Sequence, residues 1–224
     1  MKIIRPSYEI LTPISDGGIK ELRHIERIAR VCYKSEDKIS PDGESAKRLV
    51  KQLIDRGHEA MLEHGSISVL FICDRGVSHE IVRHRMASYA QESTRYCNYS
   101  KDKFGKEITF IQPSYLNFAD DPDDVKFARY MVWSTNCEMC EKGYFAMLES
   151  GMKPQEARAV LPNSLKTEIV MTANYREWRH FFKLRCDKAA HPQMRELTIP
   201  LLKELNKKLP VIFEDIEWEV SNFG

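Results

Sequence analysis

Ser66-Ile-Ser-Val-Leu-Phe-Ile-Cys73 is the stretch that most strongly predicts a β-strand in this 224-residue chain. Its Ile, Val and Phe content favours an extended backbone, and Gly65 and Asp74-Arg75-Gly76 bound it as turn signals. The same criteria predict shorter strands over residues 107–111 and 167–172. These runs indicate a β-sheet at the centre of the fold.

Helical patterns surround these strands. Residues 19–31 repeat apolar side chains at helical spacing after Asp16, a predicted N-cap, and residues 45–56 do so before Gly57, a predicted stop. A short helix or turn is predicted over residues 77–85. The later helices are predicted over residues 122–150, opened by an Asp-rich turn, 154–161, 176–184 and 192–209, the last containing Pro200 as a kink point.

The order of these elements predicts an α+β fold. Helices and strands are mixed without a regular βαβ rhythm, which argues against a doubly wound parallel sheet. Neither GxGxxG nor GxxxxGK[ST] occurs, so no glycine-rich phosphate loop is predicted. We expect residues 1–224 to form a single domain with a mostly antiparallel sheet packed by several helices, including one long helix.

The composition is typical of a globular protein. Apolar residues make up 42% of the chain and charged residues 30%, and 34 Lys and Arg against 33 Asp and Glu leave a net charge of +1. This balance argues against binding nucleic acid through bulk positive charge. No run reaches the roughly 18 apolar residues that span a bilayer, and residues 1–6 do not resemble a signal peptide. A cytoplasmic location without membrane attachment is therefore expected.

The six cysteines are expected to be free thiols, because their spacing is irregular and the chain is long for a disulfide scaffold. Cys137 and Cys140 form a C-x-x-C pair, but no second ligand pair accompanies it for a zinc site. Since the pair lies in a helical pattern, we interpret it as helix packing.

The densest group of reactive side chains lies in residues 83–96. The segment reads Arg83-His84-Arg85-Met-Ala-Ser88-Tyr89-Ala-Gln91-Glu92-Ser93-Thr94-Arg95-Tyr96. Clustered cations repel one another unless an anionic ligand or an acidic partner lies among them. Because arginine forks suit phosphate, this segment predicts a pocket for a phosphorylated small molecule.

Two further clusters flank this segment. His58, Glu63 and His64 suggest a metal site, but the two histidines are six residues apart rather than four, about 120° around a helix. A polar, hydrogen-bonded local role is the favoured interpretation. In the second cluster, Arg158 interrupts a short apolar helix and is directed either to water or to an anion.

The segment 174–185 combines polar and aromatic residues. Asn174 ends an apolar, strand-like run, where polar side chains often have functional roles. Arg176 and Arg185 add two cations to this segment. The large apolar side chains are expected to pack in the core: Trp178, Phe181, Phe182 and Leu184.

These clusters, in this order, resemble the flavin-dependent thymidylate synthases. The R-H-R-x7-S motif of that family is matched by Arg83-His84-Arg85 and Ser93, and Arg95-Tyr96 extends the match. The resemblance spans roughly residues 25 to 215 of the chain. Further matching segments are residues 29–31, 57–59, 63–64, 157–162, 174–176 and 184–185.

The resemblance implies a homotetramer whose active sites lie between subunits and hold FAD, dUMP and a folate. The implied reaction is the reductive methylation of dUMP to dTMP. In it, 5,10-methylenetetrahydrofolate supplies the carbon, and NADPH supplies electrons through FAD. The family does not use a cysteine nucleophile, and this chain has no Pro-Cys dipeptide.

Matching positions also imply ligand contacts for individual residues, with no metal ligand among them. The cofactor-binding set is His58, Ala60, Arg83, His84, Arg85, Gln91, Asn174, Tyr175, Arg176 and His180. The substrate-binding set for dUMP is Glu80, Arg83, Gln91, Glu92, Ser93, Thr94, Arg95, Arg158 and Arg185. Backbone N–H groups of residues 92–95 would cradle the phosphate, and the folate is expected to stack on the flavin.

Arg185 is the implied catalytic residue. Its guanidinium would stabilise negative charge on the N3/O2 edge of the pyrimidine as hydride reaches the ring, which can be worth about 3–4 kcal/mol per donor. Ser93 looks like a nucleophile, but no neighbouring base is assigned to it. We therefore interpret Ser93 as a phosphate or substrate contact.

Three positions depart from the family pattern. Gln91 stands where many members have Glu, so a hydrogen-bonding role survives and an anionic role is lost. Glu80 stands where a neutral Gln is familiar, which questions its contact with the nucleotide. Ala189 replaces a histidine, so a flavin or folate contact from that position is absent.

Three alternative functions stay open. The arginines of residues 83–95 would serve a nucleic-acid-binding protein, although acids are interleaved with the bases. His58, Glu63 and His64 would serve a metal-dependent hydrolase. A non-catalytic flavoprotein would bind FAD but would release no dTMP.

Overall fold

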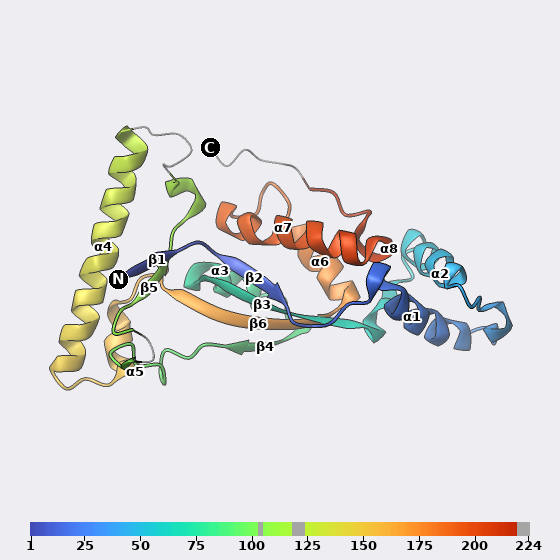
Figure 1. Cartoon of the computed structure of the whole chain (residues 1–224), viewed down its shortest axis with the longest axis horizontal. Helices are drawn as coiled ribbons and strands as arrows, with labels where there is room; N and C mark the ends of the chain where they lie inside the picture. Colours follow the sequence, from blue (N-terminus) through green and yellow to red (C-terminus); the bar gives the residue numbers. More distant parts are fainter. Residues whose placement is uncertain (103–104, 118–123, 219–224) are drawn as a thin grey trace.

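The computed structural model describes residues 1–102, 105–117 and 124–218 (Figure 1). Its centre is an antiparallel four-stranded sheet with the order β2-β3-β6-β4. Its strands are β2 (Ser7–Ile10), β3 (Ser66–Asp74), β6 (Lys166–Asn174) and β4 (Ala87–Gln91). β1 (Lys2–Ile4) and β5 (Thr109–Ile111) pair in parallel as a second, two-stranded sheet. The predicted α+β fold with a mostly antiparallel sheet is confirmed.

Helices pack around these sheets. The α-helices are α1 (Ile19–Val31), α2 (Glu44–Asp55), α3 (Arg75–Ile81), α4 (Asp124–Glu149), α5 (Pro154–Ala157), α6 (Tyr175–Arg185), α7 (Pro192–Lys208) and α8 (Pro210–Phe213). The short 3-10 helices are η1 (Asp16–Gly18), η2 (Glu36–Lys38), η3 (Glu59–His64), η5 (Ser114–Leu116) and η6 (Arg158–Val160). The predicted long helix is confirmed as α4, while its predicted start at Pro122 and the Asp-rich turn lie outside the described residues.

Most predicted elements agree with the structure to within two residues, but three predictions need correction. Asp16 is not the N-cap of α1: it lies in η1, and α1 begins after Gly18, which has a φ of 67°. Of the short helix or turn predicted over residues 77–85, only the part up to Ile81 is helical, and the R-H-R motif lies in the turn that follows. The helix predicted over residues 154–161 is divided into α5 and η6.

Three strands and one α-helix were not predicted: β1, β2, β4 and α8. The first two are short N-terminal strands, and α8 continues the pattern of α7 after one intervening residue. β4 reads Ala-Ser-Tyr-Ala-Gln, which has little of the β-branched content that marks a strand. It is extended because it pairs with β6 from Ala87 opposite Ala173 to Gln91 opposite Ile169.

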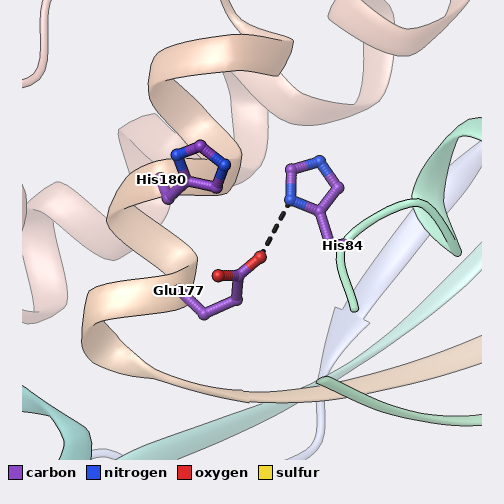
Figure 2. Close-up of side chains that lie close together, drawn as sticks. All are labelled: His84, Glu177 and His180. Atoms are coloured by element: carbon purple, nitrogen blue, oxygen red, sulfur yellow. Dashed lines mark hydrogen bonds and ion pairs between the residues drawn. The ribbon is translucent and has the colours of Figure 1, made fainter. Parts of the chain in front are cut away.

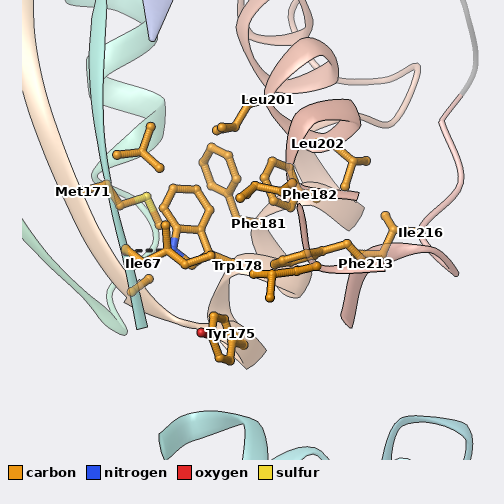
Figure 3. Packing of buried hydrophobic residues seen from close by; sticks show 14 of the residues in the cluster. Ile67, Met171, Tyr175, Trp178, Phe181, Phe182, Leu201, Leu202, Phe213 and Ile216 are labelled. Atoms are coloured by element: carbon orange, nitrogen blue, oxygen red, sulfur yellow. Dashed lines mark hydrogen bonds between the residues drawn. The ribbon is translucent and has the colours of Figure 1, made fainter. Parts of the chain in front are cut away.

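The main core lies between the sheet and helices α6 and α7 (Figures 1 and 3). Alternate residues of β3 and β6 face it, with Ile67 and Met171 fully buried. Three aromatic residues of α6 fill the centre of this core: Trp178, Phe181 and Phe182. The core prediction is wrong for Leu184, which is 50% exposed because it shares a side of α6 with the exposed His180, about 40° away around the helix.

The opposite face of the sheet is less covered. Leu70 and Val170 pair across β3 and β6 there and are only half-buried. Ser68 and Thr172, the next pair along, share a hydrogen bond of 2.7 Å between their hydroxyls. This sheet face therefore offers a mixed apolar and hydroxyl surface.

The cysteines are free thiols, as predicted. Cys137 is buried in a smaller core cluster beside α4, which agrees with helix packing as the role of the C-x-x-C pair. Within the described residues, no helix combines the length and the hydrophobicity that a membrane crossing requires.

A glycine at the junction of η3 and β3 leads to a stability prediction. A Cβ at Gly65 would come within 2.1 Å of Cε2 of Tyr175, whose ring is itself buried. Gly65→Ala is therefore expected to lower the free energy of unfolding by about 1–3 kcal/mol, measured by chemical denaturation.

Gly143→Ala is the matched control. Gly143 lies inside α4, and a Cβ there meets only Cγ2 of Val160, at an ordinary 3.7 Å. This change is expected to raise the free energy of unfolding by about 0.5–1 kcal/mol, because alanine favours a helix interior. Equal effects of the two substitutions would contradict the steric explanation for Gly65.

Candidate active site

The R-H-R motif occupies the turn between α3 and β4. Tyr89 closes this turn, because its hydroxyl donates to the carbonyl oxygens of Ile81 at 2.9 Å and of His84 at 2.7 Å. His84 is buried, whereas Arg83 and Arg85 are exposed. The guanidinium groups of these two arginines form no hydrogen bond or ion pair with any residue that the structure describes, so they are available to an anion.

Arg185, the last residue of α6, is held by three acceptors. Its Nε donates to Nε2 of His84 at 3.1 Å, and its Nη1 donates to Oε2 of Glu80 at 2.9 Å. Its Nη2 donates to the main-chain oxygen of Glu80 at 3.0 Å. A guanidinium has five N–H groups, so two have no acceptor among the described residues. These two groups can donate to a ligand from a fixed plane.

His84 is neutral in this arrangement. Its Nδ1 lies 3.0 Å from Oε1 of Glu177 (Figure 2). Because Nε2 accepts a hydrogen bond from Arg185, Nδ1 carries the proton and donates to the carboxylate. Burial lowers the pKa of His84; Glu177 raises it and Arg185 lowers it, and the balance is a pKa below the ordinary value of 6.5.

His84, Glu177 and His180 were also considered as metal ligands. Among the described residues, they are the only group of three His, Cys, Asp or Glu side chains with ligand atoms within 4.8 Å of one another. A metal would need a lone pair on Nδ1 of His84, but the bond from Arg185 leaves the proton on that nitrogen. The hydrogen bonds therefore favour a proton over a metal ion at this position.

The metal cluster considered from sequence is not assembled. His58 precedes η3 and His64 ends it. Between them, Glu63 forms an ion pair of 2.6 Å with Nη1 of Arg176. The structure therefore provides no joint coordination by these three side chains.

A cavity of about 370 Å³ opens beside the His84 group. Asn174 begins α6 there, because its Oδ1 accepts a hydrogen bond of 2.8 Å from the main-chain N of Glu177. Arg176, His180 and Lys183 follow on one side of the helix, within about 60° of one another. The cavity is lined by Glu59, Glu63, Met86, Asn174, Arg176, Glu177, His180 and Lys183. It combines three carboxylates with two cations, one amide group, one histidine and the exposed side chain of Met86.

Four other predicted cofactor contacts lie elsewhere. His58 and Ala60 are exposed at the start of η3. Tyr175 is 4% exposed, so its side chain belongs to the core. Gln91 donates through Nε2 to a hydroxyl of α3 at 3.0 Å and to a hydroxyl of the sheet at 3.2 Å, so its donor side faces inward.

A second cavity, of about 350 Å³, lies beyond the other end of β4. Arg158 reaches it from η6, and its Nη1 donates to Oγ1 of Thr94 at 2.9 Å. The cavity is lined by Arg75, His79, Thr94, Arg158, Ala159, Leu161, Pro162, Asn163 and Leu165. These lining residues include two arginines and a histidine but no carboxylate, so the cavity is suited to an anion.

The predicted backbone cradle of residues 92–95 is smaller than expected. The N–H of Glu92 donates to the sheet at the main-chain oxygen of Glu168, and the N–H of Arg95 donates to Oγ of Ser93. The N–H groups of Ser93 and Thr94 have no acceptor within the part of the chain that the structure describes. Two donors of the predicted four therefore remain for a phosphate.

The side chains of this segment are also partly engaged. Oε1 of Glu92 accepts a hydrogen bond from the hydroxyl of Tyr99 at 3.1 Å, and Oε2 pairs with Lys166 at the same distance. Arg95 is exposed, with its guanidinium carbon 5.5 Å from the ring centre of Tyr96. Arg95 is therefore open to a ligand, whereas Glu92 faces its own protomer.

The predicted arginines do not meet at one point within a protomer. Arg176 lines the first cavity and Arg158 lines the second. Arg185 ends α6, and its side chain bonds His84 and Glu80 and lines neither of these two cavities. β4 runs between Arg158 on one side and Arg176 and Arg185 on the other. Its five residues span a length of roughly 17 Å. One protomer thus presents two separate half-sites.

Comparison with known proteins identifies the family. Residues 19–211 match the sequence model of the family described as thymidylate synthase complementing protein. The chain belongs to this family. The matched range contains both half-sites, so the resemblance inferred from the R-H-R motif is confirmed.

Relatives in the thymidylate synthase complementing protein family include three enzymes named flavin-dependent thymidylate synthase. The protein of Corynebacterium aurimucosum is 32% identical over 214 residues, 90% of this chain and 82% of the relative. The protein of Mycolicibacterium vanbaalenii is 35% identical over 207 residues, which cover 91% of this chain and 81% of the relative. The protein of Geobacter sulfurreducens is 32% identical over 194 residues, which cover 84% of this chain and 78% of the relative.

Glu177, Arg75 and His79 are among the cavity-lining residues of this family member that were not predicted from the sequence. Glu177 stands three positions after Asn174, a spacing that indicates a helix cap rather than a histidine partner. Arg75 and His79 lie before the R-H-R motif, in and near a turn signal, yet both line the second cavity. Only the folded position of α3 brings them to this cavity.

Proposed function

We propose that this protein is a flavin-dependent thymidylate synthase that converts dUMP to dTMP. The observation that carries the proposal is the fixed guanidinium of Arg185, which keeps two N–H groups for a ligand beside the unpaired Arg83 and Arg85. The names of the three relatives support a flavin cofactor and the reaction class.

The first cavity is the proposed place of the flavin. Asn174, Arg176 and His180 supply hydrogen-bond donors, and Arg83 and Arg85 add charge for the phosphates. An extended dinucleotide reaches beyond a cavity of this size, which supports a site completed by another subunit. When bound, FAD supplies the hydride chemistry, with NADPH as the proposed reductant and 5,10-methylenetetrahydrofolate, stacked on the flavin, as the proposed carbon donor.

The second cavity is the proposed place of the dUMP phosphate. Arg158 and Thr94 line it together, Arg75 adds a second cation, and the unbonded N–H groups of Ser93 and Thr94 are proposed as further donors. Arg185 is proposed to meet the pyrimidine and to stabilise negative charge on its N3/O2 edge.

No cysteine nucleophile is proposed. A thiol attacks as its thiolate, so a raised pKa makes it a poor nucleophile. Burial raises the pKa of Cys186, the residue after Arg185, to about 11, and that of Cys137 to about 12. These two thiols are therefore poor nucleophiles.

A homotetramer with sites between subunits is part of the proposal. The two half-sites are separated by β4, so a nucleotide that touches both Arg158 and Arg185 fits a site built from two protomers. The half-buried face around Leu70 and Val170 offers a surface for such contact. The single domain over residues 1–224 and the cytoplasmic location stay predictions.

The test combines a visible spectrum with product analysis. The purified full-length chain is expected to take up FAD and to show a flavin spectrum that bleaches anaerobically with NADPH. With dUMP, 5,10-methylenetetrahydrofolate and NADPH it is expected to release dTMP, and reactions that lack one substrate are the controls. If the protein binds flavin but forms no dTMP, it is a non-catalytic flavoprotein, and the proposed activity is overturned.

A further inference from the structure

We propose that Glu177 is a positioning residue that holds His84 in the one tautomer that can orient Arg185. The inference rests on the proposed function, because it takes Arg185 as the group that meets the pyrimidine. It concerns a chain of four side chains: Glu177, His84, Arg185 and Glu80.

The geometry allows one direction for the hydrogen bonds. The side chains of His84 and Glu177 are 3% and 11% exposed, so water has little access to either. A carboxylate only accepts hydrogen bonds, so Nδ1 of His84 must donate to it. Nε2 then keeps its lone pair, which accepts the N–H of Arg185 at 3.1 Å.

The other protonation states of His84 would release Arg185. If Nε2 carried a proton, two N–H donors would face each other across the same contact. Arg185 would then be held only through its two terminal nitrogens by Glu80, and its plane could turn about that attachment. The two N–H groups left for a ligand would lose their fixed direction.

The ring of His84 has little freedom to avoid this conflict. Its centroid lies 4.8 Å from that of Phe181 in an edge-on contact, and the turn that carries it is closed by Tyr89. Glu177 comes from α6 and faces the ring directly (Figure 2). The carboxylate is therefore placed to select the tautomer.

Several ionisable groups face His84 from the surrounding elements. They are Glu177, His180 and Arg185 of α6, Glu80 of α3 through Arg185, and Tyr89 of β4. Burial lowers the pKa of His84, the charge of Glu177 raises it, and Arg185 and His180 lower it. Removal of the carboxylate charge must therefore lower this pKa further, and protonation of His84 would require a lower pH.

The first experiment observes the tautomer directly. The flavin-loaded full-length chain is labelled with ¹⁵N-histidine, and the His84 signal is assigned by its loss in His84→Asn. At neutral pH we expect Nδ1 to be protonated and Nε2 to be unprotonated. A protonated Nε2 in the wild-type protein would overturn the proposal.

The second experiment compares two substitutions. Glu177→Gln keeps an acceptor for Nδ1 and removes the charge, so it should keep the tautomer, retain turnover at neutral pH and shift the acidic limb of the pH profile to lower pH. Glu177→Leu removes acceptor and charge. Because Glu177 also lines the first cavity, kcat is expressed per bound flavin, and it should fall by about 10- to 100-fold. Glu44→Gln, which removes an exposed carboxylate on α2, should change none of these quantities.

The outcomes separate this inference from the proposed function. A Glu177→Leu turnover within twofold of the wild type would overturn the positioning role, as would an acidic limb that Glu177→Gln leaves in place. If Glu177→Leu does not fold, the ¹⁵N-histidine spectrum of the wild type and the pH profile of Glu177→Gln still test whether Glu177 sets the tautomer of His84. If the wild-type protein forms no dTMP, the proposed function fails, while the tautomer spectrum still tests the bond between Glu177 and His84.

Discussion

Arg185→Ala is expected to lower turnover by roughly 100- to 1000-fold, the loss seen when one preorganised donor to a developing negative charge is removed. The side chain is 18% exposed, and three N–H groups of its guanidinium are already bonded to Glu80 and His84. Its remaining two groups therefore point from a fixed plane rather than from a mobile side chain. Steady-state release of dTMP measures the effect.

Flavin content is the internal control for this prediction. Arg185 does not line the first cavity, so Arg185→Ala should retain FAD, and the visible spectrum should stay close to that of the wild type. Arg185→Lys keeps one positive charge but loses the planar fork, so it should recover only part of the turnover. Wild-type turnover in Arg185→Ala, or a loss of turnover that only follows a loss of flavin, would refute the assigned role.

Arg158→Ala is expected to raise the KM for dUMP by about 10- to 100-fold, because a charge-assisted hydrogen bond contributes about 1.5–3 kcal/mol. Arg158 is exposed and already bonds Thr94, so its guanidinium stands at the proposed phosphate position. Initial rates at varied dUMP concentration give the KM. Turnover at saturating dUMP should change little, since the phosphate does not react.

The phosphate itself provides a sharper control. Deoxyuridine, which lacks the phosphate, should bind wild type and Arg158→Ala with equal affinity in a titration followed by the flavin spectrum. Arg56→Ala, which removes an exposed arginine after α2, should leave the KM unchanged. An Arg158→Ala protein that loses deoxyuridine and dUMP binding equally would show that the residue supports structure rather than phosphate.

The elements that were predicted well are those with a local pattern. β3 and α6 carry periodic apolar residues, and each is predicted within one residue of its observed bounds. Their buried faces meet in the core, so the same residues that specify the local structure also specify its packing. Local and tertiary preferences agree there, and such agreement makes an element predictable.

β4 is the opposite case. Its small and polar residues give no strand signal, and it becomes a strand only through pairing with β6, which lies about 80 residues further along the chain. The turn that carries the R-H-R motif depends on this pairing, because Tyr89 of β4 closes it. The orientation of His84 and the outward position of Arg83 and Arg85 could therefore not be predicted locally.

The sequence by itself determined the family and the chemical character of the site, because both depend on residue types at fixed spacing. Only the tertiary structure decided how these residues are arranged. Glu177 meets His84 across 93 residues, and Arg158 meets Thr94 across 64. Sequence spacing carries no information on such contacts, since the packing of α3, α6 and the sheet creates them. For the same reason, the division of the arginines into two half-sites is a property of the fold.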